Sequence, residues 1–555
     1  MGRERIRPGS IIDGFEVGEK LHEGGMAEIF AVTKPGCDLP LVMKVPLILE
    51  GDDPTMIVSF EQEQMILPRL SGPHVPKTIA IGDFSREPYI VMERIAGVSL
   101  LEKFKAAPLP ISEVVEIGAR VATALASLHR QDVLHLDLKP SNIMFRPAAE
   151  PAKVVSGFAS GEAAHEKAEP AKVVSGFASG EAAPEKAEPA KVVSGFASGE
   201  AAHEKAEPAK AVSGFASGEA AMSLGGEAIP SFGGEAVFID FGLSRHLKLP
   251  DLLAEEFRVP MGTAPYIAPE QVMKLREEPR SDLFALGAML YALATGERPF
   301  GNPKHTTKAL MRRLYEVPTP PRVIRPEVPG FLQEIILRLL EVKPDKRYPS
   351  AGQLAFDLAH PDHVVLTERS RREKTHWMRN FLAGRFGGAK APLTRLEAYR
   401  HAATAPIIMV AVDLSEGGAS LHEPLRDILR RLLATAPESR LACVNVLKTA
   451  VIGLDPLTTE SGESVHVQRL VELRGWAVDM RLPPERITFH VLESADPAEA
   501  ITSFARNNHV DHLVLGARGS GGVRRYLGSV STAVVAEAPC TVTVARVPPA
   551  ESEAA

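Results

Sequence analysis

The sequence predicts at least two folded domains, of which the second is an α/β domain with a doubly wound parallel sheet. The chain has 555 residues, which is more than one hydrophobic core usually spans. Its composition changes near residue 361, where a basic stretch begins. Beyond residue 404, short apolar segments alternate with amphipathic ones, and this alternation is typical of βα units.

Composition and charge exclude several classes of protein. The net charge of −7 argues against a nucleic-acid-binding protein, because such proteins need excess positive charge to contact phosphates. The three cysteines, Cys37, Cys443 and Cys540, are too scattered for a disulfide framework or a paired metal site, which favours the reducing cytoplasm. The sequence shows no apolar leader and no run of eighteen apolar residues, so we expect no membrane span.

Three short segments near the N-terminus carry chemistry that is ambiguous in isolation. "LHEGGMAEIFAV" at 21–32 is typical of a strand, a glycine turn and a second strand, and glycines let a backbone approach phosphates. "LVMKV" predicts an apolar strand with a single lysine, Lys44. The helical spacing that follows places Glu63 on an inner face, where it needs a cationic partner. An ordinary hairpin and a solvated edge lysine would explain the first two segments equally well.

Two later motifs resolve this ambiguity. "HLDLKPSN" at 135–142 follows an amphipathic helix, and "IDFG" at 239–242 precedes "GTAPYIAPE" at 262–270. In this order, the motifs resemble those of the protein kinase family, specifically the bacterial Ser/Thr kinases of eukaryotic type. The resemblance implies an α+β bilobal protein kinase fold over residues 10–360, and a non-specific serine/threonine protein kinase that uses ATP and Mg²⁺.

The resemblance also implies a role for each catalytic residue. Lys44 would bind the α- and β-phosphates of ATP and pair with Glu63. Asp137 would accept the proton of the substrate hydroxyl, and Lys139 would face the transferred phosphate. Thr263 would contact Asp137 and the substrate loop. These roles match the demands of phosphoryl transfer, which depends on positioning and charge neutralisation.

A second group of residues would bind the nucleotide and the metal. Asn142 and Asp240 would hold the Mg²⁺ ions that bridge the phosphates. The remaining residues expected at the nucleotide are Gly24 and Gly25 of the glycine loop, Met92 at the back of the adenine pocket and Glu93 at the hinge. Two further residues of the resemblance are structural: Asp282 would support the catalytic loop, and Arg347 would pair with Glu270.

The sequence departs from the kinase pattern at informative positions. His22 and Ala27 stand where the glycine loop often has glycine, and Leu136 stands where many kinases have arginine. That arginine docks a phosphorylated activation loop through charge-assisted hydrogen bonds. Residues 245–261 contain no Ser, Thr or Tyr. Because the receiving arginine and the phosphate acceptor are absent together, we predict that activation-loop phosphorylation does not switch this kinase.

The second domain carries a glycine-rich segment directly after a strand. "GARGSGGVRRYLGSVS" at 516–531 and "VAVDLS" on the first strand resemble the universal stress protein family over residues 404–548. That family has an adenine nucleotide α-hydrolase-like fold, and its ATP-binding branch cradles phosphate at such a turn. The resemblance implies nucleotide contacts from Asp413, Gly516, Gly519, Gly528, Ser529 and Ser531.

Two alternatives stay open for this stress domain. The loop between Gly519 and Gly528 is one residue shorter than the ATP-binding pattern. The alternative is therefore a domain that binds no nucleotide and whose glycines only form turns. The family usually dimerises by pairing its last strand, here "CTVTVARV", which would be an exposed edge if unpaired. A homodimer through this domain is therefore a further expectation.

A nineteen-residue repeat interrupts the kinase motifs. It lies within residues 147–236, between the expected strand that follows Asn142 and the expected strand that precedes Asp240. Its units offer too few apolar residues to offset backbone entropy of about 1–2 kcal/mol per residue, so we expect a disordered, slippage-expanded loop at a hairpin tip. The alternative is a docking or phosphorylation segment, in which serines such as Ser156 and Ser160 recur.

A basic linker over residues 361–403 joins the two domains. Trp377, Phe381 and Phe386 are interleaved with its basic residues. We expect a linker helix packed on one of the domains, and the alternative is a membrane-surface helix.

The sequence as a whole therefore predicts a cytoplasmic Ser/Thr protein kinase whose stress domain senses nucleotide or organises a dimer. One rival is a pseudokinase scaffold, which would have lost Lys44, Asp137 or Asp240, yet all three are present. The other rival is a stress-domain nucleotide sensor that its own kinase domain regulates. The sequence names neither the protein substrate nor the activating signal.

Overall fold

The computed structural model describes ten segments of the chain. They are residues 6–24, 27–47, 54–84, 88–147, 234–257, 259–301, 310–374, 406–449, 464–517 and 528–546. Several residues singled out in the sequence lie outside the described segments, namely Gly25, Ser156, Ser160, Trp377, Phe381, Phe386 and Gly519.

The first lobe is an antiparallel sheet with one helix, α1, beside it. The strand order is β1-β2-β3-β4-β6-β5. Side chains alternate in burial along β4, where Leu41 and Met43 are buried and their neighbours are less so, as expected for a pleated strand with one face on a core. The elements are β1 (Ile11–Ile12), β2 (Phe15–Glu23), β3 (Ala27–Thr33), β4 (Leu41–Pro46), α1 (Pro54–Ile66), β5 (Thr78–Ile81) and β6 (Ile90–Glu93).

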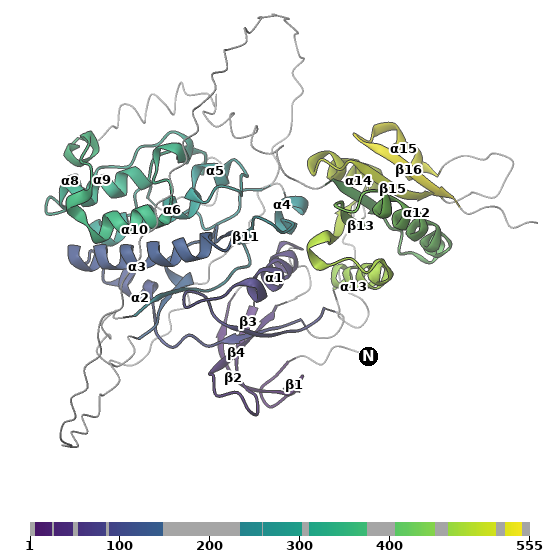
Figure 1. Ribbon diagram of the computed structural model, residues 1–555, viewed down its shortest axis with the longest axis horizontal. Helices are drawn as coiled ribbons and strands as arrows, with labels where there is room; N and C mark the ends of the chain where they lie inside the picture. The colour runs from purple at the N-terminus through teal and green to yellow at the C-terminus, as the bar shows by residue number, and fades with distance from the viewer. Residues whose placement is uncertain are drawn as a thin grey trace, which may run out of the picture. The chain divides into compact units, whose positions relative to one another are not determined.

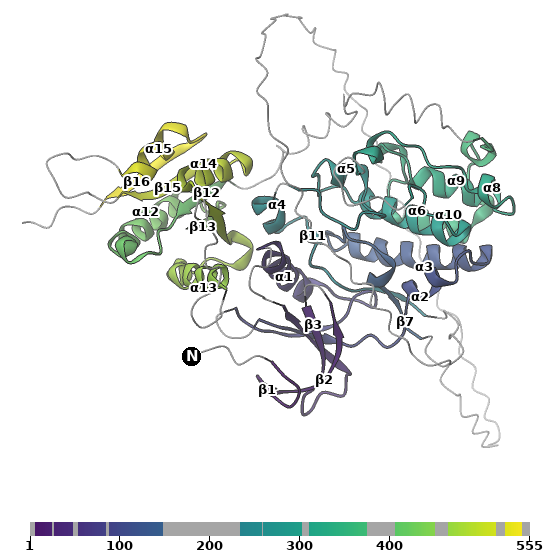
Figure 2. The same cartoon turned by 180° about the vertical axis from the view of Figure 1, so that it is seen from behind.

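The second lobe is mainly helical. Helix α3 packs against α10 and α6, and α6 also packs against α9 (Figures 1 and 2). Its elements are β7 (Val98–Ser99), α2 (Leu100–Lys105), α3 (Ile111–His129), β8 (Val133–Leu134), β9 (Ile143–Phe145), β10 (Ala236–Phe238), β11 (Arg245–His246), α4 (Leu252–Glu256), α5 (Pro269–Val272), α6 (Arg280–Thr295), α8 (Pro321–Ile324), α9 (Gly330–Leu339) and α10 (Ala351–Ala359).

The helices of this lobe follow the apolar pattern of the sequence. Helix α3 buries Ile117, Val121 and Leu125 along one face, as a period of 3.6 residues requires. Helix α6 is buried all round and forms the centre of the lobe. It ends at Gly296, whose φ of 78° lies in the left-handed region and whose N–H bonds to the Ala292 carbonyl, a common way for a helix to terminate.

The strands on either side of the repeat form the expected hairpin. Strands β9 and β10 are antiparallel, and Ile143 pairs with Phe238 while Phe145 pairs with Ala236. The Arg146 N–H also donates to the Glu235 carbonyl at 3.0 Å. The insertion was expected to end at Ala236, directly before the strand "VFI", but Ala236 is the first residue of β10 because it pairs with Phe145.

The C-terminal domain confirms the doubly wound α/β class. Its five strands are all parallel, in the order β14-β13-β12-β15-β16. The elements are β12 (Ile407–Ala411), α12 (His422–Thr435), β13 (Arg440–Lys448), α13 (Val465–Ala477), β14 (Ile487–Ser494), α14 (Pro497–Asn507), β15 (His512–Ala517), α15 (Ser529–Glu537) and β16 (Thr541–Arg546).

Helices cover both faces of this parallel sheet. Alternate residues of β12 face opposite cores: Ile408 and Val410 pack with α12 and α13, while Met409 packs with α14 and α15. Burial on both faces explains why these strands are continuous apolar runs rather than alternating ones. Within the described residues, β16 pairs only with β15 and is therefore an edge strand.

The first part of the basic linker belongs to the helical lobe. The Thr367 and Ser370 N–H groups donate to the Glu334 carboxylate of α9 at 3.0 and 3.1 Å. Arg369 also pairs with Glu334 at 3.0 Å. These bonds satisfy a carboxylate that is nearly fully buried. The segment over residues 367–370 is thus bound to α9, because its backbone N–H groups donate to a carboxylate of that helix.

Candidate active site

A buried aspartate at the start of α6 binds the backbone of the catalytic loop. Asp282 accepts hydrogen bonds from the backbone N–H groups of His135 at 2.9 Å and Leu136 at 2.8 Å. Its other partner is the His129 ring, at 2.9 Å. Burial would raise the pKa of Asp282, but the His129 bond and the two N–H donors hold it below its usual value. Asp282 therefore stays ionised and fixes the loop backbone.

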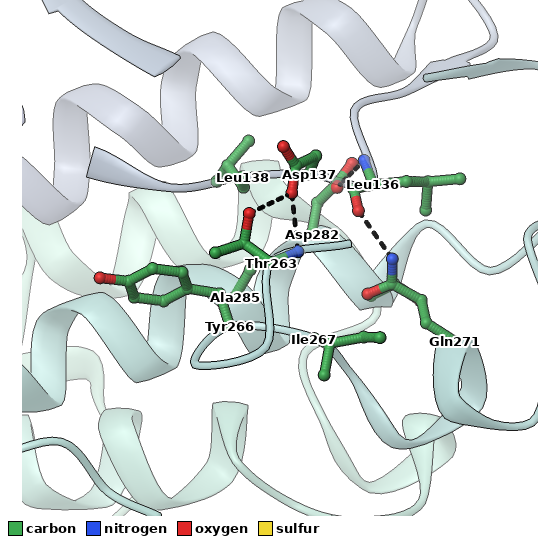
Figure 3. A pocket seen from close by; sticks show the side chains of 10 residues that line it. Leu136, Asp137, Leu138, Thr263, Tyr266, Ile267, Gln271, Asp282 and Ala285 are labelled. Atoms are coloured by element: carbon green, nitrogen blue, oxygen red, sulfur yellow. Dashed lines mark hydrogen bonds between the residues drawn. The ribbon is translucent and has the colours of Figure 1, made fainter. Parts of the chain in front are cut away.

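The loop presents Asp137 between two donors and a cation. The Thr263 hydroxyl donates to Asp137 Oδ1 at 2.6 Å, and the Thr263 N–H donates to the same oxygen at 2.8 Å. The Lys139 ammonium lies 2.9 Å from Oδ2. Figure 3 shows Asp137 and Thr263 facing each other beside the pocket that they help to line. The carboxylate is thus held in one orientation with both oxygens engaged.

A second cluster joins the two lobes around Lys44. Strand β4 carries Lys44 between β3 and β6, and its Nζ lies 2.5 Å from Glu63 of α1 and 3.0 Å from Asp240. Burial alone would lower the pKa of Lys44, but the carboxylates of Asp240 and Glu63 more than offset this and raise it above its usual value. The Phe241 N–H donates to Glu63 at 3.2 Å, so α1 is also tied to the segment after Asp240.

Asp240 has the unusual backbone of a functional residue. Its φ is 65°, a left-handed conformation that costs free energy in a non-glycine residue and concentrates at active sites. Its carboxylate is 41% exposed. Partial burial would raise the pKa of Asp240, but the ammonium groups of Lys44 and Lys139 hold it well below its usual value. An ionised and accessible carboxylate results.

Asn142 is placed next to Asp240 by the hairpin. The Ile239 N–H donates to the Asn142 carbonyl at 3.0 Å, which fixes the residue before Asp240. The Asn142 amide nitrogen donates to the Asp137 carbonyl at 3.1 Å, and its oxygen accepts the Ser141 hydroxyl at 3.4 Å and keeps a second lone pair for a ligand. The structure thus brings Asn142, Asp240 and Asp137 together, although ninety residues separate the two strands in the sequence.

A buried amide that the sequence reasoning missed links the catalytic loop to the activation segment. Gln271 of α5 donates from Nε2 to the Leu136 carbonyl at 2.7 Å and the Met261 carbonyl at 3.2 Å. Its Oε1 accepts the Ala268 N–H at 3.0 Å. Leu136 itself has a left-handed φ of 60°, and Figure 3 shows Gln271 reaching its carbonyl. The position directly after "APE" was the only signal available.

The hinge and glycine loop residues lie in and beside the sheet of the first lobe. Met92 is buried in β6. Glu93 pairs with Arg146 at 2.5 Å, and this bond lowers the pKa of the Glu93 carboxyl. Gly24 donates its N–H to the Ala27 carbonyl at 3.0 Å, which closes the turn between β2 and β3. The His22 ring lies beside Gly24, so the glycine loop is more crowded than one with glycine at position 22.

The ion pair expected for the lower lobe is present and fully buried. Arg347 donates to both carboxylate oxygens of Glu270, at 2.6 and 2.8 Å. It also bonds to the carbonyls of Arg280, Glu341 and Val342. The Ser281 hydroxyl donates to Glu270 at 2.6 Å. These partners come from α5, from the start of α6 and from the segment after α9, so the pair ties the end of the activation segment to both.

The predicted site of the stress domain lies at the carboxyl edge of its sheet. Asp413 and Gly516 follow or end the adjacent parallel strands β12 and β15. The Ser415 N–H and hydroxyl donate to Asp413 Oδ1 at 3.1 and 2.7 Å. Gly528 begins α15 as its N-cap, with Ser531 bonded back to its carbonyl at 3.1 Å. Ser529, the first residue of α15, is exposed, and the part of the loop with Gly519 is outside the described residues.

Comparison with known families agrees with both halves of this architecture. The protein kinase domain model matches residues 15–187 and 234–358, and the universal stress protein family model matches residues 405–546. The kinase match covers more than half of the chain, and the chain belongs to the protein kinase family. Its C-terminal region is a universal stress protein domain.

The individual proteins that match this chain have low sequence identity to it. Serine/threonine-protein kinase PknB of Mycobacterium leprae is 23% identical over 356 residues, which is 63% of this chain and 43% of the relative. PknB of Mycolicibacterium smegmatis is 24% identical over 356 residues, with the same coverage. The matched region spans less than half the length of these relatives.

One solved structure and one physical property complete the comparison. A crystal structure of the PknI kinase domain from Mycobacterium tuberculosis is 18% identical, covers 65% of this chain and all of that chain, and has a TM-score of 0.38. Among the residues described by the structure, we find no helix with the length and apolar character that crossing a bilayer would require.

Proposed function

We propose that this chain is an active Ser/Thr protein kinase, which transfers the γ-phosphate of Mg-ATP to serine or threonine hydroxyls of proteins. The observation that carries the proposal is the simultaneous engagement of its catalytic groups. Asp137 is held by Thr263, and Lys44 joins Glu63 to Asp240. A pseudokinase scaffold would not need to keep all of these polar contacts, several of which require desolvated charges.

The geometry supports specific steps for the residues of this chain. Asp137 would accept the proton of the substrate hydroxyl as that oxygen forms its new bond to phosphorus. Thr263 fixes Oδ1 of Asp137, so the carboxylate does not have to reorient during the transfer. Lys139, which lies against Oδ2, supplies positive charge where the transferred group carries negative charge.

The residues near Asp240 fit a magnesium ion and a triphosphate. Asp240 offers an accessible ionised carboxylate, and Asn142 offers an amide oxygen, which are the oxygen ligands that Mg²⁺ prefers. We propose that these two residues hold the metal, while Lys44 binds the α- and β-phosphates and Met92, Glu93, Gly24 and Gly25 enclose the nucleotide. When bound, Mg-ATP supplies the phosphoryl group and the charge neutralisation of its leaving group.

Transfer of radiolabelled phosphate tests this function. Wild-type protein should label itself or a generic protein substrate, and Asp137→Ala should lose the signal. Asp362→Ala, which removes an exposed carboxylate from the helical lobe, is the matched control and should label normally. If wild-type protein binds ATP but gives no more label than Asp137→Ala, the pseudokinase scaffold is the correct alternative.

We also propose that phosphorylation of the activation loop does not switch this activity. The support is the absence of hydroxyl side chains from residues 245–261 and the presence of Leu136 in place of arginine. Protein treated with a phosphatase should keep its initial rate of substrate phosphorylation. Mass spectrometry that finds a stoichiometric phosphate in residues 245–263, required for activity, would overturn the proposal.

For the C-terminal domain, we propose nucleotide sensing or dimerisation in the cytoplasm. Asp413, Gly516, Gly528, Ser529 and Ser531 would bind a second ATP, with Gly519 completing the loop. Calorimetry on the Lys44→Met chain should then show one remaining ATP site that Asp413→Ala abolishes.

The edge strand β16 supports a homodimer, which the molecular mass in light scattering would report. Limited proteolysis would test the proposed domains over residues 10–360 and 404–548.

A further inference from the structure

Arg276 is a buried arginine to which the sequence motifs assign no role. It lies in the loop between α5 and α6, and it is 7% exposed. Its guanidinium reaches three separate parts of the activation segment. Nη2 donates to the Leu243 carbonyl at 3.0 Å, Nε donates to Asp251 at 2.8 Å, and Nη1 lies 3.7 Å from the Met261 sulfur. One side chain thus contacts the beginning, middle and end of this segment.

Asp251 is the acidic partner in the middle of the segment. Its Oδ2 receives Arg276, and Arg245 lies 3.6 Å from the same oxygen. Its Oδ1 accepts the Ala254 N–H at 3.2 Å and thereby caps α4. A short carboxylate side chain is well suited to an N-cap. Two cations and one capped helix therefore converge on a single carboxylate that is 8% exposed.

Helix α4 connects the Arg276–Asp251 pair to α1. The Leu252 N–H donates to the Gln62 side chain at 3.0 Å, and Gln62 precedes Glu63 in α1. Leu252 and Leu253 also pack in an apolar cluster with Val58 of α1. The same cluster includes Leu243 and Met261, the residues at both ends of the segment. Contacts of the Arg276–Asp251 pair thus extend to the helix that carries Glu63 and to the residue two before Thr263.

We propose that Arg276 and Asp251 are positioning residues that do permanently what a phosphate and its arginine do in kinases switched by activation-loop phosphorylation. A phosphate orders such a segment by forming charge-assisted bonds to arginine. Here the carboxylate of Asp251 is encoded in the chain, and the bonds to Arg276 hold Met261 and hence Thr263 in place against Asp137. This inference rests on the proposed kinase function and explains why no phosphate is needed.

Two single substitutions that remove a charge test the proposal in the full-length chain. Asp251→Asn keeps a capping oxygen for α4 but removes the charge that Arg276 binds. Arg276→Gln removes the guanidinium and leaves the carboxylate. Because each variant removes a charge-assisted hydrogen bond that orders the segment, each should lower kcat for a protein substrate about tenfold. The KM for ATP should stay within about twofold, because the Lys44–Glu63 pair is not altered.

Controls separate positioning from a general loss of structure. Arg280→Gln removes a nearby arginine whose side chain pairs with Glu278 instead, and it should leave kcat unchanged. Hydrogen exchange should rise in residues 241–262 of Arg276→Gln and stay constant in α6. The Asp251→Asn/Arg276→Gln double variant should be no slower than either single variant, because both remove one shared interaction.

The outcomes distinguish this inference from the proposed function. If wild-type protein transfers no phosphate, the kinase function itself fails. If wild-type protein is active and both single variants keep kcat within about twofold of it, the positioning role is wrong. If Arg276→Gln does not fold, Asp251→Asn decides alone, since it retains the cap of α4: unchanged kcat and unchanged exchange in residues 241–262 would overturn the proposal.

Discussion

The hydroxyl of Thr263 offers the sharpest test of how Asp137 is held. Thr263→Val keeps the branched shape of the side chain and removes only the donor that lies 2.6 Å from Asp137 Oδ1. The backbone N–H at 2.8 Å and Lys139 at 2.9 Å remain. Asp137 therefore keeps its charge and most of its surroundings, and the substitution isolates one hydrogen bond.

The size of the effect follows from the nature of that bond. A hydrogen bond to an ionised acceptor contributes about 1.5–3 kcal/mol. If it is needed to orient Asp137 in the transition state, kcat falls by about 10- to 150-fold. The value should lie toward the lower end because one of the two donors to Oδ1 survives. Thermal unfolding should change little, since Asp137 keeps the Thr263 N–H and Lys139 as partners and valine has nearly the volume of threonine.

Steady-state phosphorylation of a protein substrate measures this prediction, with Thr263→Ser as the matched control. Serine keeps the hydroxyl and loses only a methyl group, so it should restore most of the wild-type kcat. A Thr263→Val chain that works within about twofold of wild type would refute the role of the hydroxyl. The same conclusion follows if serine is as slow as valine, because the loss would then come from packing.

Three further predictions concern stability, the insertion and pH. Arg347→Met should destabilise the chain by about 3–5 kcal/mol, because it leaves the Glu270 carboxylate buried without its cation; denaturant unfolding should show a smaller loss for Arg347→Met/Glu270→Gln. Deletion of residues 150–233 should leave kcat within about twofold, since a shorter loop costs no more entropy to close; a large loss of activity would instead indicate a functional role for the repeat. The pKa of Asp282 is held below its usual value, so its stabilisation is complete above the unfolded pKa of about 3.9 and is lost as pH falls through the folded value; urea midpoints should therefore fall less steeply from pH 5 to pH 3 in Asp282→Asn than in wild type.

The residues that sequence reasoning located are those that belong to the ordered kinase motifs. Lys44 and Glu63 pair, and Asp137 meets Thr263, because phosphoryl transfer requires these groups in any chain with this order of motifs. The α/β class of the second domain could also be predicted from the sequence, since strands buried on both faces must be continuous apolar runs.

The residues that it missed bind mainly to the backbone. Gln271 donates to two carbonyl groups, and Arg276 donates to the carbonyl of Leu243. Carbonyl groups have no residue type, so no sequence pattern marks them as partners. The same limit explains the element boundaries. Ala236 belongs to β10 through its pairing with Phe145, although the expected strand began one residue later. Thr367 is bound to α9 through its N–H, although the change in composition places it in the linker.

The β9–β10 hairpin has a consequence for how this gene can vary. Its register is fixed by backbone pairs between residues 143–145 and 236–238, directly beside Asn142 and near Asp240. The repeat lies between these two strands in the sequence, so gaining or losing a nineteen-residue copy changes the length of the insertion outside the residues that form the pairs. The tip is also a place where a reporter domain could be grafted into the kinase without rebuilding its active site.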